Sequence, residues 1–121
     1  MIEKQEHKIE FNHKLCAFVM HLIRFMDSLP DGCDSDRICE RLLKSGTRIL
    51  GNYVEGQSAG SREEFADYLN HCLESVNESI LWICVLKSDG CTDVPEAERL
   101  LKELKEIGNI FGSSIMKIKV K

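Results

Sequence analysis

Glu74 and Glu78 are the two residues of this sequence whose type and spacing best fit acid–base or metal chemistry. They lie four positions apart, so a helix would place both carboxylates on one face. One could serve as general acid and the other as base, or both could hold a divalent cation. A ferritin-like metal site, however, needs carboxylates from several helices and two Glu-x-x-His motifs, and the sequence does not contain that pair of motifs. We therefore predict that the protein is not an enzyme, and a carboxylate-based hydrolase or metal enzyme that uses these two residues is the rival hypothesis.

Histidine and cysteine offer a second possible metal site. His13 and Cys16 are close enough to share an ion, but no second pair follows at ligand spacing. The six cysteines form no C-x-x-C pair, and several recur at the spacing of a helix core. A glycine-rich phosphate loop and a serine nucleophile elbow are also missing from the sequence. We predict free thiols, no bound metal and no cofactor.

Basic side chains recur along residues 35–55 at the helical steps of four, three and four. We call this set the basic stripe, and its members are Arg37, Arg41, Lys44 and Arg48. The same steps continue to Asn52 and Glu55. Residues 62–87 repeat the spacing with polar and acidic side chains, namely Asp67, His71, Glu74 and Glu78. Residues 61–90 carry two basic and six acidic side chains, an acidic excess equal to the whole chain's net charge of −4.

An antiparallel hairpin folded near residue 58 would bring these two patterns together. The pairs placed level would be Arg48 with Asp67, Lys44 with Glu74, and Arg41 with Glu78. We interpret them as a row of salt bridges, each contributing ~0–1 kcal/mol and therefore setting register more than stability. Two alternatives stay open: a stripe that receives phosphate, and an acidic pair that performs acid–base chemistry.

Four helices are predicted to position these side chains. Apolar residues at alternating steps of three and four favour helices at about residues 12–29, 35–55, 62–87 and 94–118. The chain of 121 residues has the length of one domain, and the predicted connections are short. Short links between long helices favour antiparallel neighbours. We predict an all-α single domain, an antiparallel up-down-up-down four-helix bundle.

Small and polar residues punctuate the predicted helices. Gly46 and Gly51 lie inside the second helix, where each costs about 1 kcal/mol relative to alanine, and we predict close approach of a neighbouring helix at both. Gly56 is expected to end that helix in the left-handed conformation, and Gly90 to end the third. Ser61 and Glu64 form a capping box, S-x-x-E, before the third helix. Asp34 or Ser35 is expected to cap the second helix, and Thr92 or Asp93 the fourth.

Charge and hydropathy bear on location and partners. The longest apolar run, residues 80–86, is too short to span a bilayer, and no signal peptide is recognisable, so we expect a cytoplasmic protein. The net charge of −4 argues against a dedicated nucleic-acid-binding domain. The remaining basic feature is the C-terminal KIKVK, with Lys117, Lys119 and Lys121. We expect weak, sequence-independent RNA binding that arises mainly from these lysines.

Residues 42–86, LLKSGTRILGNYVEGQSAGSREEFADYLNHCLESVNESILWICVL, resemble the bacterial four-helix bundle proteins named after ribosomal-RNA intervening sequences. The residues that carry the resemblance are Lys44, Asn52, Glu55, Ser61, Phe65, Glu74, Glu78 and Trp82. Arg48 departs from the family pattern, which usually has a small residue there. The outer helices resemble the family only in type.

The resemblance implies a homo-oligomer, because the family's members look like ring-shaped homopentamers with no established enzymatic activity. A related branch resembles the accessory proteins of diversity-generating retroelements, which bind nucleic acid and a reverse transcriptase. The resemblance adds weight to Asn52 and Glu55, which would brace the following loop or form a subunit boundary, and to Trp82, a core residue or an interface anchor. Our leading hypothesis is a non-catalytic homo-oligomeric binding or scaffolding module. The alternative is a nucleic-acid-binding accessory protein, associated with ribosomal RNA or a reverse transcriptase.

Overall fold

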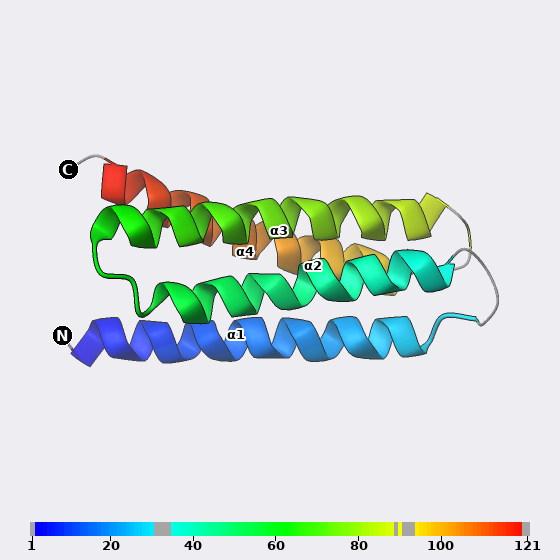
Figure 1. Ribbon diagram of the computed structural model, residues 1–121. Helices are drawn as coiled ribbons and strands as arrows, with labels where there is room; N and C mark the ends of the chain where they lie inside the picture. The colour runs from blue at the N-terminus through cyan, green and yellow to red at the C-terminus, as the bar shows by residue number, and fades with distance from the viewer. Residues whose placement is uncertain (1, 31–34, 89, 91–93, 120–121) are drawn as a thin grey trace.

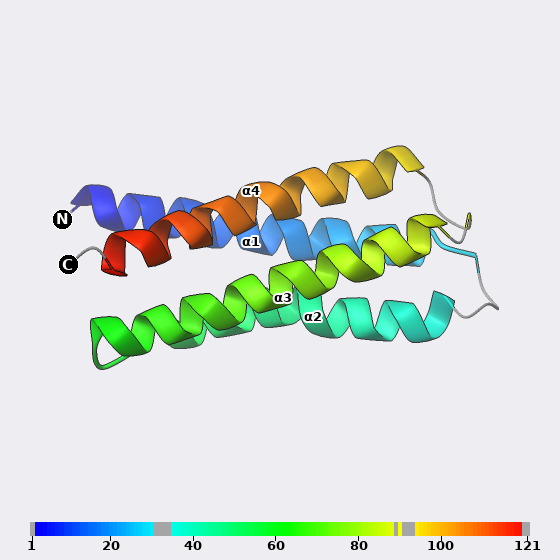
Figure 2. The same ribbon diagram turned by 90° about the horizontal axis from the view of Figure 1, so that it is seen from above.

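Four antiparallel helices make up the fold. The computed structural model describes residues 2–30, 35–88, 90 and 94–119. The helices are α1 (Ile2–Asp27), α2 (Ser35–Gly56), α3 (Arg62–Ser88) and α4 (Val94–Lys119). Each helix packs against the next, and α4 returns to α1, so the order is up-down-up-down (Figure 1). Seen from above, α2 and α3 lie on one side of the bundle, and α1 and α4 on the other (Figure 2). The predicted all-α antiparallel four-helix bundle is confirmed.

Helix α1 differs most from its predicted bounds, because it begins at Ile2 rather than near residue 12. The prediction began where the apolar face begins, at Phe11. The preceding residues are mostly Glu, Lys and Gln, which favour a helix, and they contain no proline or glycine that would stop it. The helix ends at Asp27, two residues earlier than predicted and shortly before Pro30. The other three helices agree with the prediction to within one residue at each end.

The core is formed by buried apolar residues that recur along all four helices. Its largest fully buried side chains include Phe18, Leu22, Ile49, Leu69, Ile83 and Phe111. Three aromatic rings meet at the end of the bundle that holds both termini. Phe11 lies edge-on to Tyr53 and to Phe111, with centroid distances of 5.0 and 5.3 Å. These contacts tie α1, α2 and α4 together at that end.

Helices α2 and α3 approach each other closely because small residues line their contact. Ser45 and Ser79 are buried, and their hydroxyl oxygens lie 2.9 Å apart. Each hydroxyl also lies within hydrogen-bond distance of a backbone carbonyl of its own helix, Leu42 for Ser45 at 3.1 Å and Ser75 for Ser79 at 2.9 Å. One serine therefore donates to the other, which donates to its own carbonyl. A buried hydroxyl with such partners avoids the cost of an unsatisfied polar group. The α2–α3 contact is therefore polar at its centre yet fully hydrogen-bonded there.

Three glycines of α2 have different surroundings. A Cβ atom at Gly46 would collide with the side chain of buried Leu22, so the predicted close approach is confirmed there. Nothing lies within 4 Å of a Cβ built at Gly51, and the same prediction is wrong for that residue. Gly56 was expected to have a positive φ, which is also wrong, since within the described segments Gly90 alone has one, at 74°. A Cβ at Gly56 would lie 2.9 Å from the Cβ of Tyr68, so this glycine permits helix contact instead.

The capping box predicted for α3 is present. The backbone N–H of Glu64 donates to the Ser61 hydroxyl at 3.1 Å, and the Glu64 carboxylate accepts from the backbone N–H of Gly60 at 3.0 Å. The carboxylate thus reaches one residue before the capping serine, in a variation of the usual reciprocal pair. The predicted caps Asp34, Thr92 and Asp93 lie outside the described residues.

Candidate functional site

The basic stripe lies along the outer face of α2, on the side next to α3. All four of its side chains, Arg37, Arg41, Lys44 and Arg48, are exposed. With Glu40, Ser45 and Glu78 they line an open groove of about 540 Å³ between the two helices. Arg48, which departs from the family pattern, points outward, so its size does not disturb the packing of α2.

The predicted row of salt bridges between the stripe and α3 is wrong. Across the described residues, no member of the stripe has an ion pair with Asp67, Glu74 or Glu78. The reason is angular. Glu74 lies two positions from buried Val76, about 200° around the helix, so it projects away from the core. Glu78 lines the groove, but its carboxylate accepts from the Trp82 indole and is not paired with the stripe. Two residues at the same height along neighbouring helices therefore form an ion pair only if their side chains also point toward each other.

Trp82 joins the two helices at one end of the groove. The guanidinium of Arg41 lies 5.5 Å from the centre of the Trp82 ring, a cation–π contact. The Trp82 indole N–H donates to the Glu78 carboxylate at 3.4 Å. The ring is half-buried and packs against the core with one part. The predicted core role of Trp82 thus holds for part of the ring, and the rest of the ring lies at the surface.

The other polar residues singled out from the sequence are spread along this face. Asn52 is half-buried on α2, and Glu55 is exposed one turn further on. The Glu74 side chain is 77% exposed, and its ion-pair partner is His71 on the same helix, at 3.6 Å. Lys117 and Lys119 are exposed in the last turn of α4, while Lys121 lies outside the described residues. The structure therefore brings together the stripe, Glu78 and Trp82, but not the C-terminal lysines.

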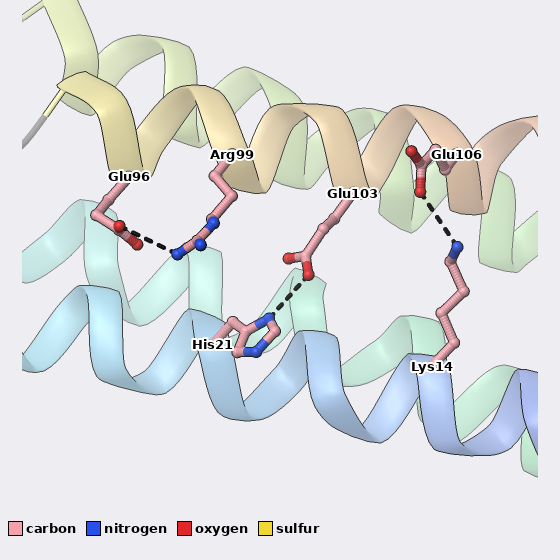
Figure 3. Close-up of polar contacts among 6 residues, drawn as sticks. All are labelled: Lys14, His21, Glu96, Arg99, Glu103 and Glu106. Atoms are coloured by element: carbon pink, nitrogen blue, oxygen red, sulfur yellow. Dashed lines mark hydrogen bonds and ion pairs between the residues drawn. The ribbon is translucent and has the colours of Figure 1, made fainter.

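Ion pairs that the sequence interpretation missed lie between α1 and α4 (Figure 3). Lys14 pairs with Glu106 at 3.2 Å, and His21 with Glu103 at 2.8 Å. A further pair, Lys87 with Glu98, connects α3 to α4. Lys14 and His21 are seven residues apart on α1, and Glu103 and Glu106 are three apart on α4. This spacing was a usable signal, because it places each pair of charges on one helix face.

The possible metal ligands do not converge. In the part of the chain that the structure describes, no group of three or more His, Cys, Asp or Glu side chains is arranged to hold an ion. His13 and Cys16 are both exposed on the outer side of α1. The one Glu-x-x-His stretch of the sequence, which joins Glu10 to His13, is exposed on the same helix. The described helices include none that is long and apolar enough to cross a membrane.

Comparison with known proteins identifies the family. Residues 7–113 match the family described as 23S rRNA-intervening sequence protein. The chain belongs to this family. The match spans α2 and α3 completely, so it includes the basic stripe and Trp82. No curated protein matches the chain.

A solved structure that superposes on this 23S rRNA-intervening sequence protein has the same fold. It is a crystal structure of a protein of unknown function from the S23 ribosomal protein family of Bacteroides thetaiotaomicron. The two chains are 24% identical and superpose with a TM-score of 0.76, over 86% of this chain and 96% of that one. At this identity the likeness concerns the four-helix architecture.

Proposed function

We propose that this 23S rRNA-intervening sequence protein is a cytoplasmic, non-catalytic homo-oligomer, most simply a pentamer, that serves as a binding or scaffolding module. One observation carries the proposal: large apolar side chains are exposed on the outer faces of the helices. Leu81 and Val54 are 54% and 53% exposed, and Ile9 is 55% exposed. Leu81 is continuous with Val85, which is 36% exposed one turn further along α3, and contiguous exposed apolar surface commonly marks a protein interface.

The geometry of the acidic residues favours a binding module over an enzyme. Acid–base catalysis by a pair of carboxylates depends on surroundings that exclude water and separate their pKa values. Glu74 and Glu78 instead project from the exposed side of α3, and the Glu74 side chain is 77% exposed. Solvent screens both groups there. A hydrolase based on this pair would therefore need a second element to cover it.

Light scattering on the purified protein tests the assembly. We expect a mass about five times that of the 13.8 kDa chain, unchanged on dilution through the micromolar range. A pentamer is the number that the resemblance implies. A mass of 13.8 kDa at micromolar concentration would contradict the proposal.

RNA binding is a second candidate function, favoured by the absence of ion pairs along the basic stripe in the described structure. The expectation that α3 neutralises the stripe is not met. Four exposed cations, of which Arg41 contacts Trp82, resemble the combination of phosphate contacts and an aromatic stacking platform used for single-stranded nucleic acids. Lys117 and Lys119 add exposed charge near the other end of the bundle.

Fluorescence polarisation with a labelled single-stranded RNA at ~150 mM salt distinguishes these two basic regions. We expect weak binding without sequence preference that falls steeply as salt rises. The variant Arg37→Gln/Arg48→Gln should weaken binding and reduce the slope against log salt by about 2, since each lost phosphate contact removes about 1. The matched variant Lys117→Gln/Lys119→Gln loses the same charge elsewhere. A larger loss in the lysine variant would assign binding to the C-terminal turn instead.

A further inference from the structure

The two outer faces that flank α2 are complementary in charge and in apolar surface. One is the groove between the end of α1 and the start of α2, which has a volume of about 650 Å³ and which we call the α1–α2 groove. Its described lining contains acids and apolar side chains but no base, and the residues used below are Ile23, Met26, Leu43, Asp27 and Asp36. Glu40 lies between this groove and the one between α2 and α3, and it lines both. Leu43 is 40% exposed although it is apolar. This groove therefore has an apolar floor and an acidic rim.

The opposite flank of α2, together with α3, carries the complementary features. Arg37 and Arg41 are exposed there, and half-buried Trp82 lies beside Arg41. Val85, which is 36% exposed, follows Trp82 by three residues on α3. We call this surface the α2–α3 face. Neither its two arginines nor the groove acids Asp27 and Asp36 have an ion-pair partner among the described residues. The lining between α2 and α3 thus has an excess of base, with four cations against Glu40 and Glu78, whereas the charged groups of the α1–α2 groove are all acids.

We propose that the α2–α3 face of one copy docks into the α1–α2 groove of the next copy. Trp82 and Val85 would cover the apolar floor, while Arg37 and Arg41 meet Asp27 and Asp36 at its rim. Burial of the apolar groups supplies affinity, and the charges set the orientation and exclude the reversed contact. The inference rests on the proposed homo-oligomer and names the surfaces that form it.

The positions of the two surfaces favour a closed ring over an open filament. Both lie along the first half of α2, because Asp36 and Arg37 are adjacent in the sequence, as are Glu40 and Arg41. A neighbouring copy is therefore held at nearly the same height, with little rise along the bundle axis. A heterologous contact closes into a ring when the rotation between copies has no rise.

The arrangement of the helices also limits the number of copies. In a four-helix bundle the helices occupy the corners of a rough square, so the two faces that share α2 are about 90° apart. The directions to the two neighbours in a cyclic ring differ by about 90° for four copies and about 108° for five. A ring of about four or five copies follows, with α2 facing the central axis. The exposed residues of α2 that line neither groove, such as Thr47 and Gly51, would line the opening.

Charge reversal tests the docking contact. The variants are Asp27→Lys/Asp36→Lys in the groove, Arg37→Glu/Arg41→Glu on the α2–α3 face, and the chain that carries all four changes. We expect each double variant to fall to the 13.8 kDa monomer by light scattering, because both sides of its contact then have one sign. The fourfold variant should recover the mass of the wild type, because its groove and its face are again opposite in charge.

The control variant is Asp67→Lys/Glu74→Lys, which makes the same change in net charge as the groove variant on an exposed part of α3 outside both surfaces. It should keep the wild-type mass, and circular dichroism should show equal helix content in all variants. An oligomeric wild type whose mass survives both double reversals would overturn the inference while leaving the homo-oligomer intact. A monomeric wild type would overturn the homo-oligomer itself. Failure of the fourfold variant to reassemble, while folded, would also contradict the pairing.

Discussion

Replacing Gly46 by alanine is expected to lower the free energy of unfolding by about 1–3 kcal/mol, whereas the same change at Gly51 is expected to raise it by about 1 kcal/mol. Both glycines lie inside α2, so helix propensity favours alanine equally at the two positions. The difference comes from their neighbours. A Cβ at Gly46 would collide with Leu22, which has no exposed surface, while a Cβ at Gly51 meets nothing within 4 Å. Overpacking at Gly46 should outweigh the gain in propensity.

Urea denaturation of the two variants beside the wild type measures this difference. The m-value should be unchanged, so that a shift in midpoint reports stability directly. Each variant serves as the control of the other, since the substitution and the helix are the same. A Gly46→Ala variant as stable as the wild type would contradict the predicted overpacking, because Leu22 would then have room to move. A destabilised Gly51→Ala would indicate that the outer side of α2 is covered, as it is when a subunit boundary lies there.

The sequence was sufficient to predict the four helices because their cores repeat strictly. Leu15, Phe18, Leu22 and Phe25 follow steps of three and four, and all are buried. The start of α1 was missed because residues 2–10 are helical by propensity and continuity, without an apolar face that a periodicity search could detect. Local pattern thus predicts helices that bury a face better than helices that extend beyond the core.

The charged residues were harder to place because their contacts depend on the rotation of each helix about its axis. Spacing alone placed Lys44 and Glu74 level, but Glu74 points outward and pairs with His71. The pairs that do form between helices, such as His21 with Glu103, join α1 to α4, which are the first and last elements in sequence. Which helices become neighbours across the bundle follows from the closure of the fold, so that information is absent from any local segment.

The glycines show the same limit at the scale of single atoms. Gly46 and Gly51 are five residues apart, and about 500° of helical rotation, or 140° net, separates them. One therefore faces α1 and the other faces outward. The sequence alone could not say which glycine fills which role. The outward glycine lies on the part of α2 that would face the axis of the inferred ring, where a small side chain narrows the opening least.

Cys72 is expected to react with iodoacetamide ~10³-fold more slowly in the folded protein than in the unfolded chain at pH 8, because the thiolate is the reacting form. Burial raises the pKa of the Cys72 thiol from its ordinary value of 9.0 to about 12. The side chain has no exposed surface, and its S–H donates to the carbonyl oxygen of Ile49 at 3.6 Å. Cys16 and Cys84, on the outer sides of α1 and α3, are exposed and should be labelled first.

Mass spectrometry of peptides after timed labelling measures each cysteine separately, and labelling in guanidinium chloride supplies the unfolded rate for the same residue. The folded-state labelling rate of Cys72 should rise about tenfold per pH unit up to pH 10, since the pH stays far below the pKa of the thiol throughout.

The raised pKa of Cys72 also predicts how the stability of the protein depends on pH. Above pH 9 the unfolded chain releases the Cys72 proton while the folded chain retains it, so the free energy of unfolding should fall by up to about 1.4 kcal/mol per pH unit towards pH 12. Labelling of Cys72 as fast as Cys16 would show that the α2–α3 contact opens on the labelling timescale, and the buried serine pair at its centre would then be exposed to water with it.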